Sequence, residues 1–296
     1  MKCLYKPLGV SLVAVAGLLG PLSAGAANTD PLRICAAADE LPFSKSDGSG
    51  FENEIAKIVA DGMGREAEFV YADEPGIYLV PKYLKKDKCD VITGVDADDP
   101  RVATTEPYYR SSYVFVYPQG ENVEVDSWDS ADLQKMTRFA ISPYSPVEPK
   151  LRDMNKWDDN LNYMYSLIGF KSRRNEYVRY APEKLLGEVI DGEADIAIVW
   201  GPEVARYVQQ AQQPLTMKRV PDTTTRRGED LKFSYAQAMA VRPDDTELLD
   251  ALNTALDEKH AEIRTVLKTE GMPLMNIDDN SDPRDSDAQN NTGAAS

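Results

Sequence analysis

The segment CDVITGVDADDPRVATTEPYY, residues 89–109, combines acidic, basic and aromatic side chains and is typical of a ligand-binding segment. Its carboxylates from Asp96 to Asp99 could suggest a calcium or lanthanide site. An EF-hand loop that starts at Asp96 needs glycine at its sixth position and glutamate at its twelfth, where this chain has Arg101 and Pro107. We therefore expect an acidic turn here and no metal site.

Histidine is too scarce for most nucleophilic or zinc-dependent chemistry. His260 is the sole histidine, and it lies in a charged, helix-forming stretch where we expect a solvated side chain. A zinc site with several histidines is excluded, and a Ser-His-Asp or Cys-His enzyme would depend on this one residue.

Two carboxylates open a predicted helix in GFENEIAKIVADGMG, residues 50–64. Glu52 and Glu54 stand in its first turn, where the helix dipole favours negative charge. Neither has a partner in the sequence that marks an acid–base pair, so we do not predict an enzyme. In an enzyme, the catalytic acid or base would be Glu52 or Asp96.

Short apolar strands that alternate with amphipathic helices must position these side chains. This alternation predicts an α/β protein with mainly parallel sheets, organised in two units. The expected strands cover residues 32–37, 66–71, 90–95, 112–117, 138–142, 195–200, 215–221 and 237–241. The expected helices cover residues 50–64, 79–86, 126–136, 181–192, 202–210 and 245–268.

The two ends of the chain differ from the rest in composition. Residues 1–27 begin with lysines, continue through an apolar run and end in small residues, which predicts a cleaved signal peptide and a soluble, exported protein without a membrane anchor. Cleavage would leave Cys35 and Cys89, which favour a disulfide in an oxidising compartment, with two buried thiols as the alternative. Residues 276–296 are acidic and rich in Asn, Ser and Asp, so we expect a disordered tail.

The net charge of -16 restricts the partners. Such a chain repels nucleic acid and anionic lipid and could steer towards a basic partner. The simpler alternative is an acidic surface that only maintains solubility.

Several stretches resemble a known family. They are LPF (41–43), GFENEIAKIVADGMG (50–64), LVPKYLKKDKCDVI (79–92), EPYYRSSYVFVY (106–117) and APEKLLGEVIDGEADIAIV (181–199). Over nearly all of residues 30–275 the chain resembles the periplasmic solute-binding proteins of the amino-acid-binding type, family 3. More narrowly, RICAAADELPFS and the segment that begins at Cys89 resemble a branch of this family from bacterial methanol oxidation systems.

The resemblance implies a periplasmic protein with a two-lobed, type II periplasmic-binding-protein-like fold and a cleft between the lobes. The first lobe would contain residues 28–117 and 222–275, and the inserted second lobe residues 118–221, with crossing segments near 117–120 and 220–235. The implied strand order 2-1-3 in the first lobe would make the strands that carry the two remaining cysteines neighbours.

The residues that would clamp a free amino acid depart from the family pattern. Such relatives hold the α-carboxylate with an arginine and the ammonium with a carboxylate. Here Arg101 is closer to Pro107 than in those relatives, and Trp200 stands in place of the acid. An unpaired ammonium in a partly dry cleft is costly, so a free amino acid is a poor candidate.

Aromatic walls would instead suit a peptide segment or a quinone-like ring. For one of the adjacent residues Tyr108 and Tyr109, ordinary packing is the alternative, because neighbours along a strand face opposite ways. The complete set of cleft candidates is Phe43, Glu52, Tyr78, Asp96, Arg101, Tyr108 and Trp200.

The resemblance implies a non-catalytic accessory protein that binds subunits of a PQQ-dependent methanol dehydrogenase, or their cytochrome c partner, to assist maturation or activation. The first alternative is a receptor that delivers a small polar ligand to an ABC transporter, and the second is an enzyme in the same cleft. No cofactor is implied. The polar segment 143–165 would be an interaction loop or a plain surface elaboration.

Overall fold

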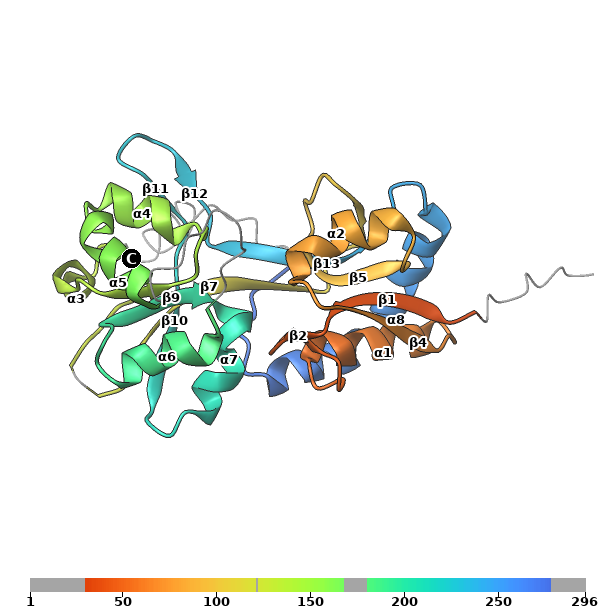
Figure 1. Ribbon diagram of the computed structural model, residues 1–296, viewed down its shortest axis with the longest axis horizontal. Coiled ribbons are helices and arrows are strands. Elements are labelled where there is room, and N and C mark those ends of the chain that lie inside the picture. Colours follow the sequence, from red (N-terminus) through yellow and green to blue (C-terminus); the bar gives the residue numbers. More distant parts are fainter. Residues whose placement is uncertain (1–29, 121, 168–179, 278–296) are drawn as a thin grey trace, which may run out of the picture.

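The computed structural model describes residues 30–120, 122–167 and 180–277. The predicted signal peptide, 1–27, and nearly all of the predicted tail, 276–296, lie outside the described residues. Figure 1 shows two lobes side by side, joined by the long strands β7 (Tyr109–Pro118) and β13 (Ser234–Val241). The α/β, two-lobed fold that the resemblance implies is therefore confirmed.

The first lobe is built on three parallel strands in the order β4-β1-β5. This is the implied 2-1-3 order, and β13 extends it antiparallel to β5. The elements of this lobe, besides β13, are β1 (Leu32–Ala37), β2 (Asp39–Glu40), β3 (Ser44–Lys45), α1 (Phe51–Gly62), β4 (Ala67–Ala72), η1 (Gly76–Tyr78), α2 (Leu79–Lys82), η2 (Leu84–Lys86), β5 (Val91–Asp96), β6 (Ala103–Thr104) and α8 (Thr246–Thr269).

Alternation along β1 distributes its side chains between two apolar layers. Leu32 and Ile34 belong to a cluster with residues of α1 and α8, whereas Cys35 belongs to a cluster with residues of α2 and η2. The sheet is therefore covered on both faces, which explains why five of the six residues of β1 are buried.

The second lobe has a smaller core sheet, in which β8 and β9 are parallel and β7 joins β9 antiparallel. Its single large apolar cluster runs from Val114 to Phe233. The elements of this lobe are α3 (Ala131–Lys135), β8 (Phe139–Ile141), α4 (Val147–Asp153), α5 (Trp157–Leu167), α6 (Pro182–Ile190), β9 (Ile196–Trp200), α7 (Gly201–Gln210), β10 (Leu215–Arg219), β11 (Thr223–Thr224) and β12 (Asp230–Leu231).

The strands that cross between the lobes change partners at definite residues. β7 pairs with β13 up to Ser112 and with β9 from Tyr113 onward. On the returning strand, Phe233 belongs to the second core, and β13 begins at Ser234. We infer crossings at these two points. The second is within the expected range 220–235, the first is a few residues before 117–120, and the lobe boundaries stay predictions.

The segment 143–165 is not a loop. It forms α4 and α5, with Val147, Leu151 and Trp157 buried in the second core. Asn160 is fully buried and holds α5 to β8, because its side chain accepts from the Phe139 N–H at 2.8 Å and donates to the Phe139 carbonyl at 3.1 Å. Its polar composition reflects the exposed faces of two short helices.

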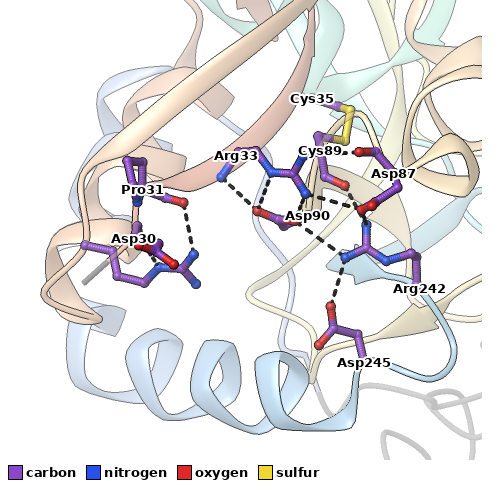
Figure 2. A network of polar contacts seen from close by, with 10 residues as sticks. Asp30, Pro31, Arg33, Cys35, Asp87, Cys89, Asp90, Arg242 and Asp245 are labelled. Carbon is purple, nitrogen blue, oxygen red and sulfur yellow. Dashed lines mark hydrogen bonds and ion pairs between the residues drawn. A yellow bond between two sulfur atoms is a disulfide. The ribbon is translucent and has the colours of Figure 1, made fainter. Parts of the chain in front are cut away.

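The predicted disulfide between Cys35 and Cys89 is present, with the two Cα atoms 5.6 Å apart. Beside it, Figure 2 shows a polar network at the amino-terminal ends of β1 and β5. Arg33 pairs with Asp90 at 2.6 Å, and Arg242 donates to the Cys89 carbonyl at 2.7 Å. These contacts stabilise the amino-terminal ends of β1 and β5. A ligand is expected at the opposite, carboxyl ends of these strands.

Among the described residues, no helix is both long and apolar enough to cross a bilayer.

Candidate functional site

A cavity of about 320 Å³ opens at the carboxyl ends of β1 and β5. In open α/β sheets this end of the strands is where ligands bind. The first lobe supplies most of the lining, and Trp200 reaches it from the second lobe. Five of the seven predicted residues line the cavity: Phe43, Glu52, Asp96, Arg101 and Trp200.

Tyr78 and Tyr108 do not line it. Tyr78 ends η1, and the ammonium of Lys82 lies 4.4 Å from the centre of its ring. Tyr108 lies behind the cavity, where its hydroxyl accepts from the Gly94 N–H at 2.8 Å and donates to Glu52 Oε2 at 2.7 Å. Tyr108 therefore supports a wall residue rather than forming the wall.

The expectation that Tyr108 and Tyr109 face opposite ways is wrong. Both are buried, their ring centres are 5.1 Å apart, and the Tyr109 hydroxyl also reaches the Glu52 carboxyl, at 3.4 Å. The reason is that β7 begins at Tyr109, so Tyr108 precedes the strand and does not follow its alternation.

Among the carboxyl groups of the cavity, Glu52 has the most strongly shifted pKa. It stands in the first turn of α1 and is only 4% exposed. Burial raises the pKa of Glu52 to about 7, although hydrogen bonds from Tyr108, Thr93 and Tyr109 lower it. Near neutral pH the carboxyl is thus partly protonated and can both donate and accept a hydrogen bond.

Two carboxylates of the acidic turn have partners within the chain. Arg101 pairs with Asp99, with Nη2 2.6 Å from Oδ2 and Nε 2.9 Å from Oδ1. Asp96 accepts from the Gln237 amide at 2.6 Å. Within the described ranges, His, Cys, Asp and Glu side chains nowhere gather in groups of three that could hold a metal ion. Because of its contacts with Asp99, the guanidinium of Arg101 already has a carboxylate partner.

Trp200 is the second lobe's contribution to the cavity. It ends β9, and its ring lies 5.6 Å from that of Tyr113 and 5.9 Å from that of Tyr235, which belong to the two crossing strands. The nearest acid along the chain, Glu203, is buried in the first turn of α7, accepts from Ser142 at 3.4 Å and does not line the cavity.

Several lining residues were not predicted. Glu40 stands out because its carboxyl accepts from the Gly76 N–H at 2.7 Å and so positions η1 over the cavity. With Glu40 included, four carboxylates line the cavity and Arg101 is the single basic residue there. The position of Glu40 shortly after the carboxyl end of β1 could have indicated that it lines the cavity. Further polar or aromatic lining residues that were not predicted include Asn53, Phe69, Thr93, Asp99 and Gln237.

The chain matches the model of bacterial extracellular solute-binding proteins, family 3, over residues 32–265. It is 40% identical to Protein MoxJ of Methylorubrum extorquens over 283 residues, which cover 91% of this chain and 94% of the relative. It is also 40% identical to Protein MoxJ of Paracoccus denitrificans over 263 residues, or 88% and 95% of the two chains.

The crystal structure of MxaJ from Methlophaga aminisulfidivorans MPT is similar with a TM-score of 0.79 and 51% sequence identity, and the match covers 82% of this chain and 100% of the other. These likenesses confirm the resemblance that the motifs indicated, and a family of extracellular binding proteins implies a periplasmic location. The chain belongs to the bacterial extracellular solute-binding proteins of family 3, and MoxJ proteins are among its relatives.

Proposed function

We propose that this chain is a non-catalytic periplasmic accessory protein of a PQQ-dependent methanol dehydrogenase system, and that it binds the dehydrogenase to assist its maturation or activation. The observation that carries this proposal is the likeness to MoxJ and MxaJ proteins along most of the chain. The partner is a dehydrogenase subunit, or the cytochrome c partner of the dehydrogenase.

The chemistry of the cavity supports a protein partner over a free amino acid. Arg101 is occupied by Asp99, so no free guanidinium awaits an α-carboxylate. The lining carboxylates would attract the ammonium of a zwitterion but repel its α-carboxylate, so a cationic group without a carboxylate fits this lining better. Aromatic surface from Phe43 and Trp200 together with these carboxylates suits a basic or amphipathic side chain that projects from a protein.

A binding role agrees with the surroundings of Glu52. Its hydrogen-bond partners are Thr93 and the hydroxyls of Tyr108 and Tyr109. Burial and the nearby carboxylate keep the two tyrosine hydroxyls protonated, because both raise the pKa values of Tyr108 and Tyr109. A shifted carboxyl without a second titrating group opposite it does not form an acid–base pair.

The second candidate is a receptor for a small polar ligand of an ABC transporter. The cavity at the strand ends favours it, because its volume of about 320 Å³ suits a small metabolite. Such a receptor binds one metabolite tightly and closes its lobes around it.

A pull-down at low and at moderate salt tests the leading proposal. Purified dehydrogenase subunits and the cytochrome are each passed over the immobilised protein, and the Asp96→Asn/Glu40→Gln variant serves as the cavity mutant. The matched control is Asp158→Asn/Glu183→Gln, which removes two charges from helices of the second lobe. We expect a subunit to be retained by the native protein and by the control but less by the cavity mutant. Absence of any retained subunit at both salt concentrations would rule the proposal out.

A further inference from the structure

A third connection joins the lobes in addition to the two crossing strands. The segment Glu270–Met275 leaves the end of α8 in the first lobe and runs along β7. The Met275 N–H donates to the Arg110 carbonyl at 2.9 Å, and the Ser111 hydroxyl donates to the Pro273 carbonyl at 3.2 Å. The segment is thereby fixed beside the point where β7 passes from one lobe to the other.

On its other side this segment is bound by α7 of the second lobe. Arg206 pairs with Glu270 through two parallel contacts, Nε to Oε2 at 2.7 Å and Nη2 to Oε1 at 2.8 Å. Both side chains are mostly buried, at 19% and 13% exposure. Arg206 also donates to the Ser49 carbonyl of the first lobe at 3.2 Å. A bidentate and largely buried pair holds its partners more firmly than a surface pair does.

Apolar packing adds to this contact. Ala205 of α7 is fully buried, and it belongs to the core cluster of the first lobe together with Met272. At the start of the helix, a Cβ on Gly201 would lie 2.5 Å from Pro273 Cγ and 2.6 Å from the Ser112 carbonyl oxygen. Only glycine permits an approach this close. Rotating the second lobe away would therefore break the ion pair and expose apolar surface.

We propose that the segment Glu270–Met275 is a strap that fixes the angle between the two lobes, with the Arg206–Glu270 pair as its lock. Hinge closure needs the few residues that join two lobes to absorb a rotation. Two crossing strands permit such a rotation, whereas a third attachment on the α7 side opposes it. The protein then presents a cleft of fixed width. This inference does not depend on the proposed accessory role, but it disagrees with a receptor that closes its lobes.

Distances between spin labels on the two lobes, measured by double electron–electron resonance, test the strap. The labels are attached through Lys86→Cys in the first lobe and Lys135→Cys in the second, both exposed, with the native disulfide left oxidised. The strap variants are Arg206→Gln and Glu270→Gln. The matched control is Arg138→Gln, because Arg138 pairs with Glu193 inside the second lobe.

We expect one narrow distance distribution for the native protein and for the control, and a second population or clear broadening for both strap variants. A broad native distribution, or strap variants that match the control, would overturn the inference. The double variant Arg206→Glu/Glu270→Arg restores opposite charges at the same positions and should recover the narrow distribution. Circular dichroism of each variant separates loss of the lock from loss of the fold, and an unchanged distribution in a folded strap variant counts against the lock.

Discussion

Replacing Glu52 with glutamine should change how the stability of this protein depends on pH. Burial raises the pKa of Glu52 from 4.5 to about 7. Since each pH unit corresponds to about 1.4 kcal/mol, ionising this carboxyl in the folded protein costs about 3 kcal/mol more than in the unfolded chain. The Glu52→Gln variant keeps a neutral group of similar shape and avoids this cost.

The raised pKa of Glu52 determines whether stability rises or falls with pH. A group with a raised folded pKa contributes its full stability below the unfolded value of 4.5 and loses it as the pH rises through about 7. Relative to the Glu52→Gln variant, the native protein should therefore lose stability between pH 4.5 and pH 8, by up to about 3 kcal/mol. Near pH 4.5 the two proteins should differ little.

Urea unfolding at pH 4.5, 6 and 8 measures this difference, and the comparison cancels the titration of all other groups. The matched control is Glu54→Gln, because Glu54 stands in the same helical turn but is exposed. The control should follow the native protein at every pH. If the stability difference between the native protein and Glu52→Gln stays constant from pH 4.5 to 8, the buried carboxyl titrates normally and the reasoning is refuted.

Three further variants test the fold by urea unfolding at pH 7. Replacing both Cys35 and Cys89 with serine should cost about 4 kcal/mol, because the disulfide spans 54 residues; no loss would mean that the network of Figure 2 alone holds this end of the sheet. Asn160→Ala should cost about 2 kcal/mol, because it leaves a buried backbone N–H and C=O of β8 without partners; a change below about 0.5 kcal/mol would contradict this. Gly94→Ala should destabilise by more than about 1 kcal/mol, since φ is +66° and the new Cβ would lie 2.9 Å from the Glu52 carboxyl; an unchanged midpoint would show that the turn can relax.

Most of the fold could be predicted because its elements are regular and its strands are buried. The runs LRICAA and DIAIVW became β1 and β9, and the long helix predicted at 245–268 became α8, Thr246–Thr269. Helix 181–192 became α6, which starts at Pro182 as expected of proline in a first turn. The helices α4 and α5 in the segment 143–165 were not predicted, because they are short and polar and their burial depends on tertiary contacts.

The site was predicted less completely, because it depends on side-chain directions and on contacts between residues that are distant in the sequence. Trp200 lines the cavity because it ends a core strand, which the sequence reveals, and Phe43 lies in the turn between β2 and β3. Tyr78 points to Lys82, and Tyr108 points to Glu52, because a turn or a strand start decides the direction of a side chain. Contacts such as that of Arg206 with Glu270 join residues 64 positions apart, and no spacing rule indicates them.

Thermal unfolding against two panels of ligands tests the proposed function most directly. One panel contains small metabolites, including amino acids, small acids and peptides, and the other contains separately purified dehydrogenase subunits and their cytochrome partner. A ligand that binds only the folded state raises the unfolding temperature by mass action. An accessory protein should be stabilised by a dehydrogenase subunit and by none of the metabolites. Stabilisation by one metabolite, with no effect of any protein, would contradict the proposal and identify the cavity as a solute site.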